Sequence, residues 1–262
     1  MKIILANQFK NEEKRIQEWI LYHKSLGIKD FCLVNDYSTD KSIELIKSIH
    51  DVNVDILNSD CPELLYFKNS EMTEIYKGNV LLAHNIITNF KKIHNFCLNK
   101  YGENIIIGYF DVDEFIFSNS NYDVIETILK NIKDWPVLSL HSLEVDSTKF
   151  TLNSWVTLQT TKAMSEKSKF KSTRATTKKS FQNLSLRSLC NNFNYYNLEI
   201  GSYIHNGGVP EDKTYTIPIN ELAFLHYRNP VYDPEINIPL CDTEYPIVTK
   251  IAKKAYFEFY GI

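Results

Sequence analysis

The alternation of apolar and polar positions divides the first 117 residues into short strands and longer helices. Apolar runs typical of buried strands cover residues 2–6, 31–34 and 52–57, and a fourth run begins at Ile105. Between these runs, apolar residues recur at helical spacing, which predicts helices over residues 12–25, 43–49 and 74–100. This order of strands and helices predicts an α/β fold, in which a mostly parallel central sheet is flanked by helices.

After residue 117 the pattern becomes less regular. It predicts a helix over residues 122–132, strands over 137–143 and 155–160, a short apolar segment at 221–225 and a helix over 247–259. Residues 161–197 are rich in Lys, Ser, Thr and Asn and resist assignment. They form either a solvated loop or a lid that carries cations to a phosphorylated ligand. We therefore expect a regular first half followed by an irregular C-terminal part.

Three acidic residues, Asp111, Asp113 and Glu114, follow the fourth apolar run directly. In an extended chain Asp111 and Asp113 point the same way, because side chains alternate with period two. Two neighbouring carboxylates repel each other unless a cation joins them, and oxygen ligands suit Mg²⁺ or Mn²⁺. Open α/β sheets bind ligands at the carboxyl ends of their strands. The sequence therefore predicts a divalent metal site here, and the alternative is an exposed acidic loop.

Composition narrows the classes of function. The chain has 262 residues, 44% of them hydrophobic, which is enough for one large core. The net charge of −3 argues against a nucleic-acid partner. The five cysteines are an odd number without CxxC spacing, which favours a reduced, cytoplasmic setting. The apolar start at residues 1–6 is too short for a signal peptide or a membrane span.

An ordered set of short motifs resembles a known family. In chain order the motifs are Lys10-Asn11-Glu12, Glu18-Trp19, Tyr22-His23, Leu26-Gly27, Asn35-Asp36-Tyr37-Ser38-Thr39-Asp40, Cys97, Phe110-Asp111-Val112-Asp113-Glu114-Phe115 and His226-Tyr227. Over residues 3–117, and again near 226, the chain resembles bacterial glycosyltransferase-2-like proteins related to glycosyltransferase family 92. The resemblance implies a GT-A (Rossmann-like) fold and transfer of sugars from nucleotide sugars. It also implies one domain over residues 1–262, with a nucleotide-sugar-binding half at 1–120 and an acceptor-side half at 121–262.

The resemblance implies roles for individual residues. Mn²⁺ or Mg²⁺ on the donor diphosphate would be held by Asp111, Asp113 and His226. The donor, which we expect to be a UDP sugar, would be bound by Asn11, Glu12, Asp36, Asp111 and Arg228. A mid-chain lysine is the alternative to Arg228 as the diphosphate clamp. The structural alternatives are helix-start chemistry for Asn11 and Glu12, a turn or helix cap for Asp36, and a core position for His226.

The catalytic base and the acceptor-side loop are less determined. Relatives in the resembled family mostly invert the anomeric centre, and an inverting transfer needs a carboxylate base near the acceptor hydroxyl. The candidates are Asp146, Glu211 and Asp212, together with Glu144 and Glu166. Many relatives carry Trp-x-x-Phe-Gly after the acidic turn, whereas Trp155 is followed here by Val-Thr-Leu-Gln. The acceptor-side loop therefore departs from the family pattern.

Partners and rival functions complete the expectations. We expect a glycan or glycolipid acceptor and a role in polysaccharide biosynthesis, as the resemblance implies. The helix over residues 247–259 carries Lys250, Lys253 and Lys254, so it either docks on the fold or makes a peripheral contact at the inner membrane surface. A haloacid-dehalogenase-like phosphohydrolase also uses Asp-x-Asp after a strand, although near the start of its domain. A nucleotide-binding protein without catalysis is the second alternative.

Overall fold

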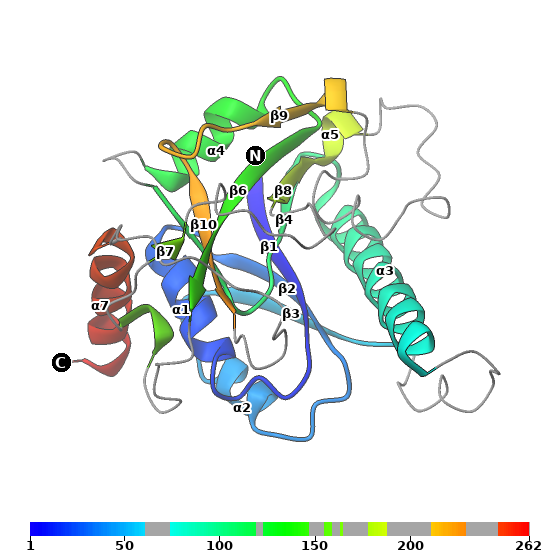
Figure 1. Ribbon diagram of the computed structural model, residues 1–262, viewed down its shortest axis with the longest axis vertical. Helices are drawn as coiled ribbons and strands as arrows, with labels where there is room; N and C mark the ends of the chain where they lie inside the picture. Colours follow the sequence, from blue (N-terminus) through cyan, green and yellow to red (C-terminus); the bar gives the residue numbers. More distant parts are fainter. Residues whose placement is uncertain are drawn as a thin grey trace.

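The computed structural model describes residues 1–60, 74–118, 123–146, 155–158, 163–164, 178–187, 211–228 and 246–261 (Figure 1). The first half contains β1 (Lys2–Phe9), α1 (Ile16–Ser25), β2 (Asp30–Asn35), α2 (Ser42–Lys47), β3 (Asn53–Asn58), α3 (Glu74–Tyr101), β4 (Ile105–Tyr109) and β5 (Glu114–Phe117). The second half contains α4 (Val124–Ile132), β6 (Val137–Asp146), the 3-10 helix η2 (Val156–Leu158), β7 (Ala163–Met164), β8 (Lys178–Asn183), α5 (Leu184–Arg187), the 3-10 helix η4 (Glu211–Lys213), β9 (Thr214–Thr216), β10 (Ala223–Arg228) and α7 (Pro246–Tyr260).

The predicted strands and helices of the first half are confirmed, with ends shifted by a few residues. The strand predicted over residues 155–160 is wrong, because residues 156–158 form η2. The N–H groups of Val156 and Thr157 donate to the carboxylate of Glu18, which is a partner that the local sequence does not reveal. Strands β5 and β8 were not predicted. The short apolar segment predicted at residues 221–225 overlaps β10, which begins at Ala223.

One sheet joins strands from both halves of the chain. Its order is β3-β2-β1-β4-β8-β6-β10-β5, with β7 and β9 paired to β6. Strands β1 to β4 pair in parallel, β8 is antiparallel to both β4 and β6, and β10 is parallel to β6. Since β4 and β6 both oppose β8, they run in the same direction. The carboxyl ends of β1, β2, β4, β6 and β10 therefore share one edge of the sheet, where α/β proteins bind ligands.

The sheet must curl, because β4 and β5 are close in sequence but far apart in strand order. Three strands lie between them, which in a flat sheet means four spacings or about 19 Å. Only residues 110–113 join the two strands, and they form a turn in which the Glu114 N–H donates to the Asp111 carbonyl at 3.0 Å. A turn this short cannot cover that distance. Curling brings β5, and the acidic turn with it, back toward the carboxyl ends of β1 and β4.

Helices cover both faces of the sheet. Helix α3 packs Phe90 and Ile93 against Ile4 and Tyr109 on one face. Helices α1, α2, α4 and α7 lie over the larger core on the other face, and α7 packs on α1 (Figure 1). None of the helices in the described part of the chain is long and apolar enough to span a bilayer.

Gly108 sets how closely β4 and β8 pack. It pairs in register with Phe181, and a β-carbon added at Gly108 would lie 2.4 Å from the Phe181 ring. Real side chains do not approach so closely, so only glycine allows this ring to lie across β4. The position of β8 beside the acidic turn therefore depends on glycine, which has no side chain, at position 108 of β4.

Candidate active site

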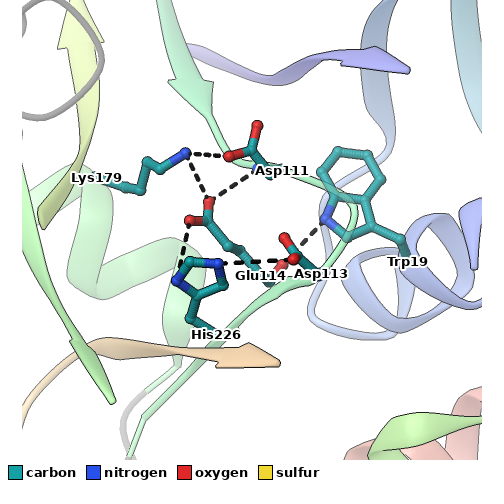
Figure 2. Close-up of polar contacts among 6 residues, drawn as sticks. All are labelled: Trp19, Asp111, Asp113, Glu114, Lys179 and His226. Carbon is teal, nitrogen blue, oxygen red and sulfur yellow. Dashed lines mark hydrogen bonds and ion pairs between the residues drawn. The ribbon is translucent and has the colours of Figure 1, made fainter. Parts of the chain in front are cut away.

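The acidic residues lie in the turn that leaves the carboxyl end of β4 (Figure 2). The Asp111 N–H donates to Glu114 Oε2 at 2.8 Å, so the turn closes on its own glutamate. Because the chain turns here, the expectation that Asp111 and Asp113 point the same way is wrong. Asp111 faces Lys179, and Asp113 faces His226.

Lys179 forms ion pairs with two carboxylates of the acidic turn. It comes from β8, its side chain is 6% exposed, and its ammonium lies 2.6 Å from Asp111 Oδ2 and 3.0 Å from Glu114 Oε2. Burial alone would lower the pKa of Lys179, but Asp111 and Glu114 raise it above its ordinary value. The lysine is therefore charged over the whole physiological range of pH.

His226 reaches the other side of the turn from β10. Its Nε2 lies 3.6 Å from Asp113 Oδ2, and its Nδ1 lies 4.0 Å from Glu114 Oε1. The backbone fixes this arrangement, because His226 pairs with Glu114 in the sheet and the Tyr227 N–H donates to the Asp113 carbonyl at 2.9 Å. Asp113 and His226 are both partly exposed, with 27% and 17% of the side chain accessible, so a ligand can reach them.

The electrostatics of the turn shift the pKa values of Glu114 and Asp113 in opposite directions. Burial raises the pKa of Glu114 to about 7, and the nearby Asp111 and Asp113 add to this effect while Lys179 opposes it. Burial would also raise the pKa of Asp113, but the attraction and hydrogen bond of His226, together with the charges of Lys179 and Arg15, outweigh it and lower that pKa below its usual value. Asp113 is therefore an anion at neutral pH, as a metal ligand must be.

Helix α1 holds β5 by three hydrogen bonds. The Trp19 Nε1–H donates to the Glu114 carbonyl at 3.0 Å, and the Tyr22 hydroxyl donates to the Ile116 carbonyl at 3.0 Å. The Ile116 N–H donates to His23 Nε2 at 3.3 Å, and His23 Nδ1 bonds the Trp19 carbonyl at 2.9 Å. The motif residues Trp19, Tyr22 and His23 are fully buried, and their hydrogen bonds position the strand that follows the acidic turn.

Glu18 of the same helix holds the segment at residues 155–158. Its two carboxylate oxygens accept from the N–H groups of Val156 and Thr157 and from the Thr157 hydroxyl, at 2.6–3.0 Å. Burial raises the pKa of Glu18 to about 7, although these three bonds oppose the rise. Trp155 packs edge-on against Tyr256 of α7 at 5.1 Å. The motif Glu18-Trp19 thus fastens both β5 and η2 to α1.

The first two loops at the carboxyl edge are bound to each other. The Asn11 N–H donates to Ser38 Oγ, and Asn11 Oδ1 accepts from the Thr39 N–H at 2.8 Å. Glu12 donates its N–H to Ser42 Oγ at 2.8 Å, and burial raises the pKa of its carboxyl to about 7, with Asp113, Asp40 and Asp111 adding to the rise and Arg15 opposing it. The Glu12 carboxyl is thus near enough to sense the acidic turn.

Asp36 is 5% exposed at the end of β2. Its N–H donates to the Phe9 carbonyl at 2.8 Å, and its Oδ2 accepts from Gln8 Nε2 at 3.3 Å. The structure therefore places the predicted donor residues Asn11, Glu12 and Asp36 along the edge that also holds Asp111. The side-chain oxygen of Asn11 accepts the Thr39 N–H, so it links the two loops.

The remaining predicted residues lie near opposite ends of strand β6. In the backbone register, Glu144 of β6 lies beside His226 and Asp146 lies beside Arg228. Glu211 precedes β9, which pairs with the first residues of β6, and Asp212 is exposed next to it. Seven residues of strand, or about 23 Å, separate that end of β6 from Glu144.

The assignment of Glu211 or Asp212 as the base stays a prediction, although the backbone register puts both residues near the amino end of β6, away from Glu144. Glu166 falls outside the described residues.

The sequence did not single out Lys179, which was one of eight cations in a segment without an assigned structure. Phe181 is the only apolar residue from Lys178 to Asn183, so this strand has no hydrophobic alternation by which the sequence could have revealed it. Among the described residues, no three His, Cys, Asp or Glu side chains converge as ligands of one ion. The predicted set of three protein ligands is therefore not assembled, since Lys179 engages Asp111.

Comparisons with solved structures find distant similarity. Glucosyl-3-phosphoglycerate synthase from Mycobacterium tuberculosis, solved with Mn²⁺, uridine diphosphate and glucosyl-3-phosphoglycerate, is 11% identical with a TM-score of 0.41, and the match covers 100% of this chain and 80% of that chain. Inositol-1-phosphate CTP transferase from T. maritima is 10% identical with a TM-score of 0.37, covering 97% and 96%. No curated protein matches the chain.

Comparison with protein families covers nearly the whole chain. The model of glycosyltransferase family 92 matches residues 5–255. This match confirms the resemblance seen in the sequence motifs and the prediction that the protein is a glycosyltransferase. The mostly parallel sheet flanked by helices confirms the GT-A fold expected of such a protein. The chain therefore belongs to glycosyltransferase family 92.

Proposed function

We propose that the protein is a metal-dependent glycosyltransferase that moves a sugar from a nucleotide sugar, a UDP sugar in our assignment, to a hydroxyl group of its acceptor. The observation that carries this proposal is the approach of Asp113 and His226 to 3.6 Å at the carboxyl edge of the sheet. Both side chains are partly exposed, and they come from strands far apart in the sequence. Family membership removes the support for the phosphohydrolase alternative.

The pair formed by Asp113 and His226 fits a divalent ion that is shared with a diphosphate. Two neighbouring ligands of an octahedral ion, each about 2.1 Å from it, lie about 3 Å apart, close to the observed separation. Mg²⁺ and Mn²⁺ commonly take one or two protein ligands and complete their shell with phosphate oxygens and water. When bound, the ion would neutralise charge on the departing nucleoside diphosphate.

The donor would lie along the edge formed by the first two loops and the acidic turn. The nucleoside is assigned to the loops that carry Asn11, Glu12 and Asp36, because hydroxyl and N–H groups of a nucleoside need acceptors such as these. The strands β2 and β4 are two spacings apart, or about 10 Å, with β1 between them. This spacing leaves room for a ribose between a base near Asp36 and a diphosphate near Asp113.

In the transfer, the acceptor oxygen forms a bond to the anomeric carbon while the bond from that carbon to the diphosphate oxygen breaks. A carboxylate takes the proton of the acceptor hydroxyl, and inversion follows if attack comes from the face opposite the leaving group. Backbone register places Glu144 and Asp146 beside His226 and Arg228, so these two are the base candidates we favour. Arg228 remains our candidate for a diphosphate contact.

We propose a glycan or glycolipid as the acceptor. Helix α7 supports a peripheral contact with a membrane that carries such a lipid, because Lys250, Lys253, Lys254 and Phe257 are exposed on it. Its other side docks on α1, with Val248, Ala252 and Ala255 buried. Both readings of this helix from the sequence are thus compatible.

The metal role is tested by Asp113→Asn. We expect loss of sugar transfer and of Mn²⁺-dependent UDP binding, with an unchanged circular dichroism spectrum, because the carboxylate is partly exposed and does not support the core. Transfer by the wild-type protein should stop in EDTA and return with Mn²⁺.

Asp134→Asn is the matched control, since Asp134 is an exposed carboxylate outside the site. Full activity of Asp113→Asn, or of the wild-type protein in EDTA, contradicts the metal role. Binding of nucleotides without turnover of any sugar donor favours the non-catalytic alternative.

A further inference from the structure

Lys179 is buried in a place where a lysine needs anionic partners. Its side chain is 6% exposed, and its ammonium contacts Asp111 at 2.6 Å and Glu114 at 3.0 Å. A buried ammonium without such partners is strongly unfavourable, and so is a buried carboxylate without a cation. Glu114 is 1% exposed, so the two residues depend on each other.

The acidic turn holds more negative charge than His226 could balance. Asp111, Asp113 and Glu114 lie within four residues, and the carboxyl of Glu12 senses two of them. A metal ion balances this charge only while it is bound. The ammonium of Lys179 is part of the chain, so it balances the charge at all times and lets the turn form before any ion arrives.

The contacts divide the carboxylate oxygens into two groups (Figure 2). Lys179 engages Asp111 Oδ2 and Glu114 Oε2, while His226 faces Asp113 Oδ2 and Glu114 Oε1. Glu114 lies between the two groups and touches both. Asp111 is therefore engaged by the ammonium of Lys179, whereas the partly exposed Asp113 faces the imidazole of His226.

We propose that Lys179 is a positioning residue, a built-in cation that keeps Asp111 away from the metal ion and so confines the ion to Asp113 and His226. The inference rests on the metal site of the proposed function. Asp111, whose side chain is 51% exposed, is then left to contact the donor by hydrogen bonds. Removing the ammonium should free Asp111 and Glu114 to act as extra metal ligands.

The test is a set of Mn²⁺ titrations without nucleotide, followed by electron paramagnetic resonance of the free ion. Relative to the wild-type protein, we expect Asp113→Asn to weaken Mn²⁺ binding by about tenfold or more, and Asp111→Asn to change it by less than about threefold. We expect Lys179→Met to strengthen binding by about tenfold, and Asp111→Asn in that background to remove the gain. A lysine that only supports the fold would not change the effect of Asp111→Asn.

Lys179→Arg keeps the charge and should leave the Mn²⁺ affinity close to that of the wild type. If Lys179→Met does not fold, the double variant Lys179→Met/Asp111→Asn and the comparison of Asp111→Asn with Asp113→Asn in the Lys179 background decide the question. Equal losses for those two single variants overturn the inference, as does unchanged affinity in a folded Lys179→Met. A wild-type protein that binds no Mn²⁺, alone or with UDP, contradicts the proposed function itself.

Discussion

His23 shows how a single residue can be held in one protonation state. Its Nε2 accepts from the Ile116 N–H, which leaves the ring proton on Nδ1 to be donated to the Trp19 carbonyl. The ring is fully buried and stacks on Phe115 at 5.9 Å. Burial lowers the pKa of His23 to about 3, and the hydrogen bond to Trp19 only partly opposes this. The neutral imidazole is therefore part of the folded state.

We expect His23 to destabilise the protein in acid. Between pH 6.5 and about 3 the unfolded chain binds a proton at His23 and the folded chain does not, so this residue's contribution to stability is present above pH 6.5 and is lost as the pH falls. The full loss is about 4–5 kcal/mol. Urea denaturation at several pH values should therefore show a smaller acid loss in His23→Phe than in the wild type.

The comparison with His23→Phe is needed because other buried groups change the stability of the fold in the opposite direction as the pH falls. Burial raises the pKa values of Glu12, Glu18 and Glu114 to about 7, and these residues make the folded state more stable as the pH falls from 7 toward 4.5. They are present in both proteins, so the difference between the two isolates His23. Parallel pH profiles of the two proteins would show that His23 is not held neutral.

Residues of the site were predictable where a family motif carried the signal. The resemblance assigned Asp113 and His226 to one metal site, and the structure brings their side chains to 3.6 Å. The partner of Asp111 was not predictable, since Lys179 is 68 residues away and only the sheet register brings it to the turn. The expectation that Asp111 and Asp113 share a direction failed because the backbone turns between β4 and β5.

At the level of elements, α1 illustrates what a periodic pattern can reveal. The spacing of Ile16, Trp19 and Ile20 predicted the helix, and all three are buried. The pattern did not reveal that Glu18 is buried too, nor that the helix bonds β5 and η2. Periodicity identifies the side of a helix that faces a core, whereas the partners on that side are set by tertiary packing.

Strand β8 depends on Gly108, and this dependence gives a test. We expect Gly108→Ala to destabilise the protein by about 1–3 kcal/mol, because the new methyl group overlaps Phe181 and also approaches Leu5 at 3.0 Å. Phe181 lies two residues from Lys179, on the same side of the strand, so sugar transfer should fall as well.

Urea denaturation and a transfer assay measure the two effects of Gly108→Ala. The control is Phe181→Leu, alone and combined with Gly108→Ala, since a smaller side chain at 181 makes room for the methyl group. If the double variant is no more stable than Gly108→Ala, the contact between Gly108 and Phe181 does not limit the packing of β8.

For the molecule as a whole, the sequence predicted the parallel first half of the sheet but not its curled second half. The first half is built from local units of strand and helix, which a periodic pattern can reveal. The strands that the sequence did not predict, β8 and β5, are short and run antiparallel to their neighbours, which are distant in sequence. The division into a half at 1–120 and a half at 121–262 stays a prediction, although strands of both halves share one sheet.

The exposed side of α7 gives a prediction for the intact protein. We expect the protein to sediment with vesicles of phosphatidylcholine and phosphatidylglycerol, and much less with phosphatidylcholine alone. The reason is that each lysine near an anionic surface contributes about 1 kcal/mol, and Phe257 adds an exposed apolar contact.

The variant Lys250→Glu/Lys253→Glu should release the protein from anionic vesicles. Lys133→Glu, an exposed lysine next to α4, is the matched control and should still sediment. Equal sedimentation of the double variant and the wild type would count against α7 as the contact.

The interleaving of the sheet also bears on how the protein is made. When β5 leaves the ribosome, β4 and β5 have both been synthesised, but the strands that separate them, β6, β8 and β10, have not. At that stage β4 has an unpaired edge, because its neighbour β8 has not been made. This strand carries the apolar residues Ile105, Ile106 and Ile107, so it can associate with other nascent chains. We therefore expect biosynthetic yield to be limited by this late closure and to rise when translation is slowed by cold.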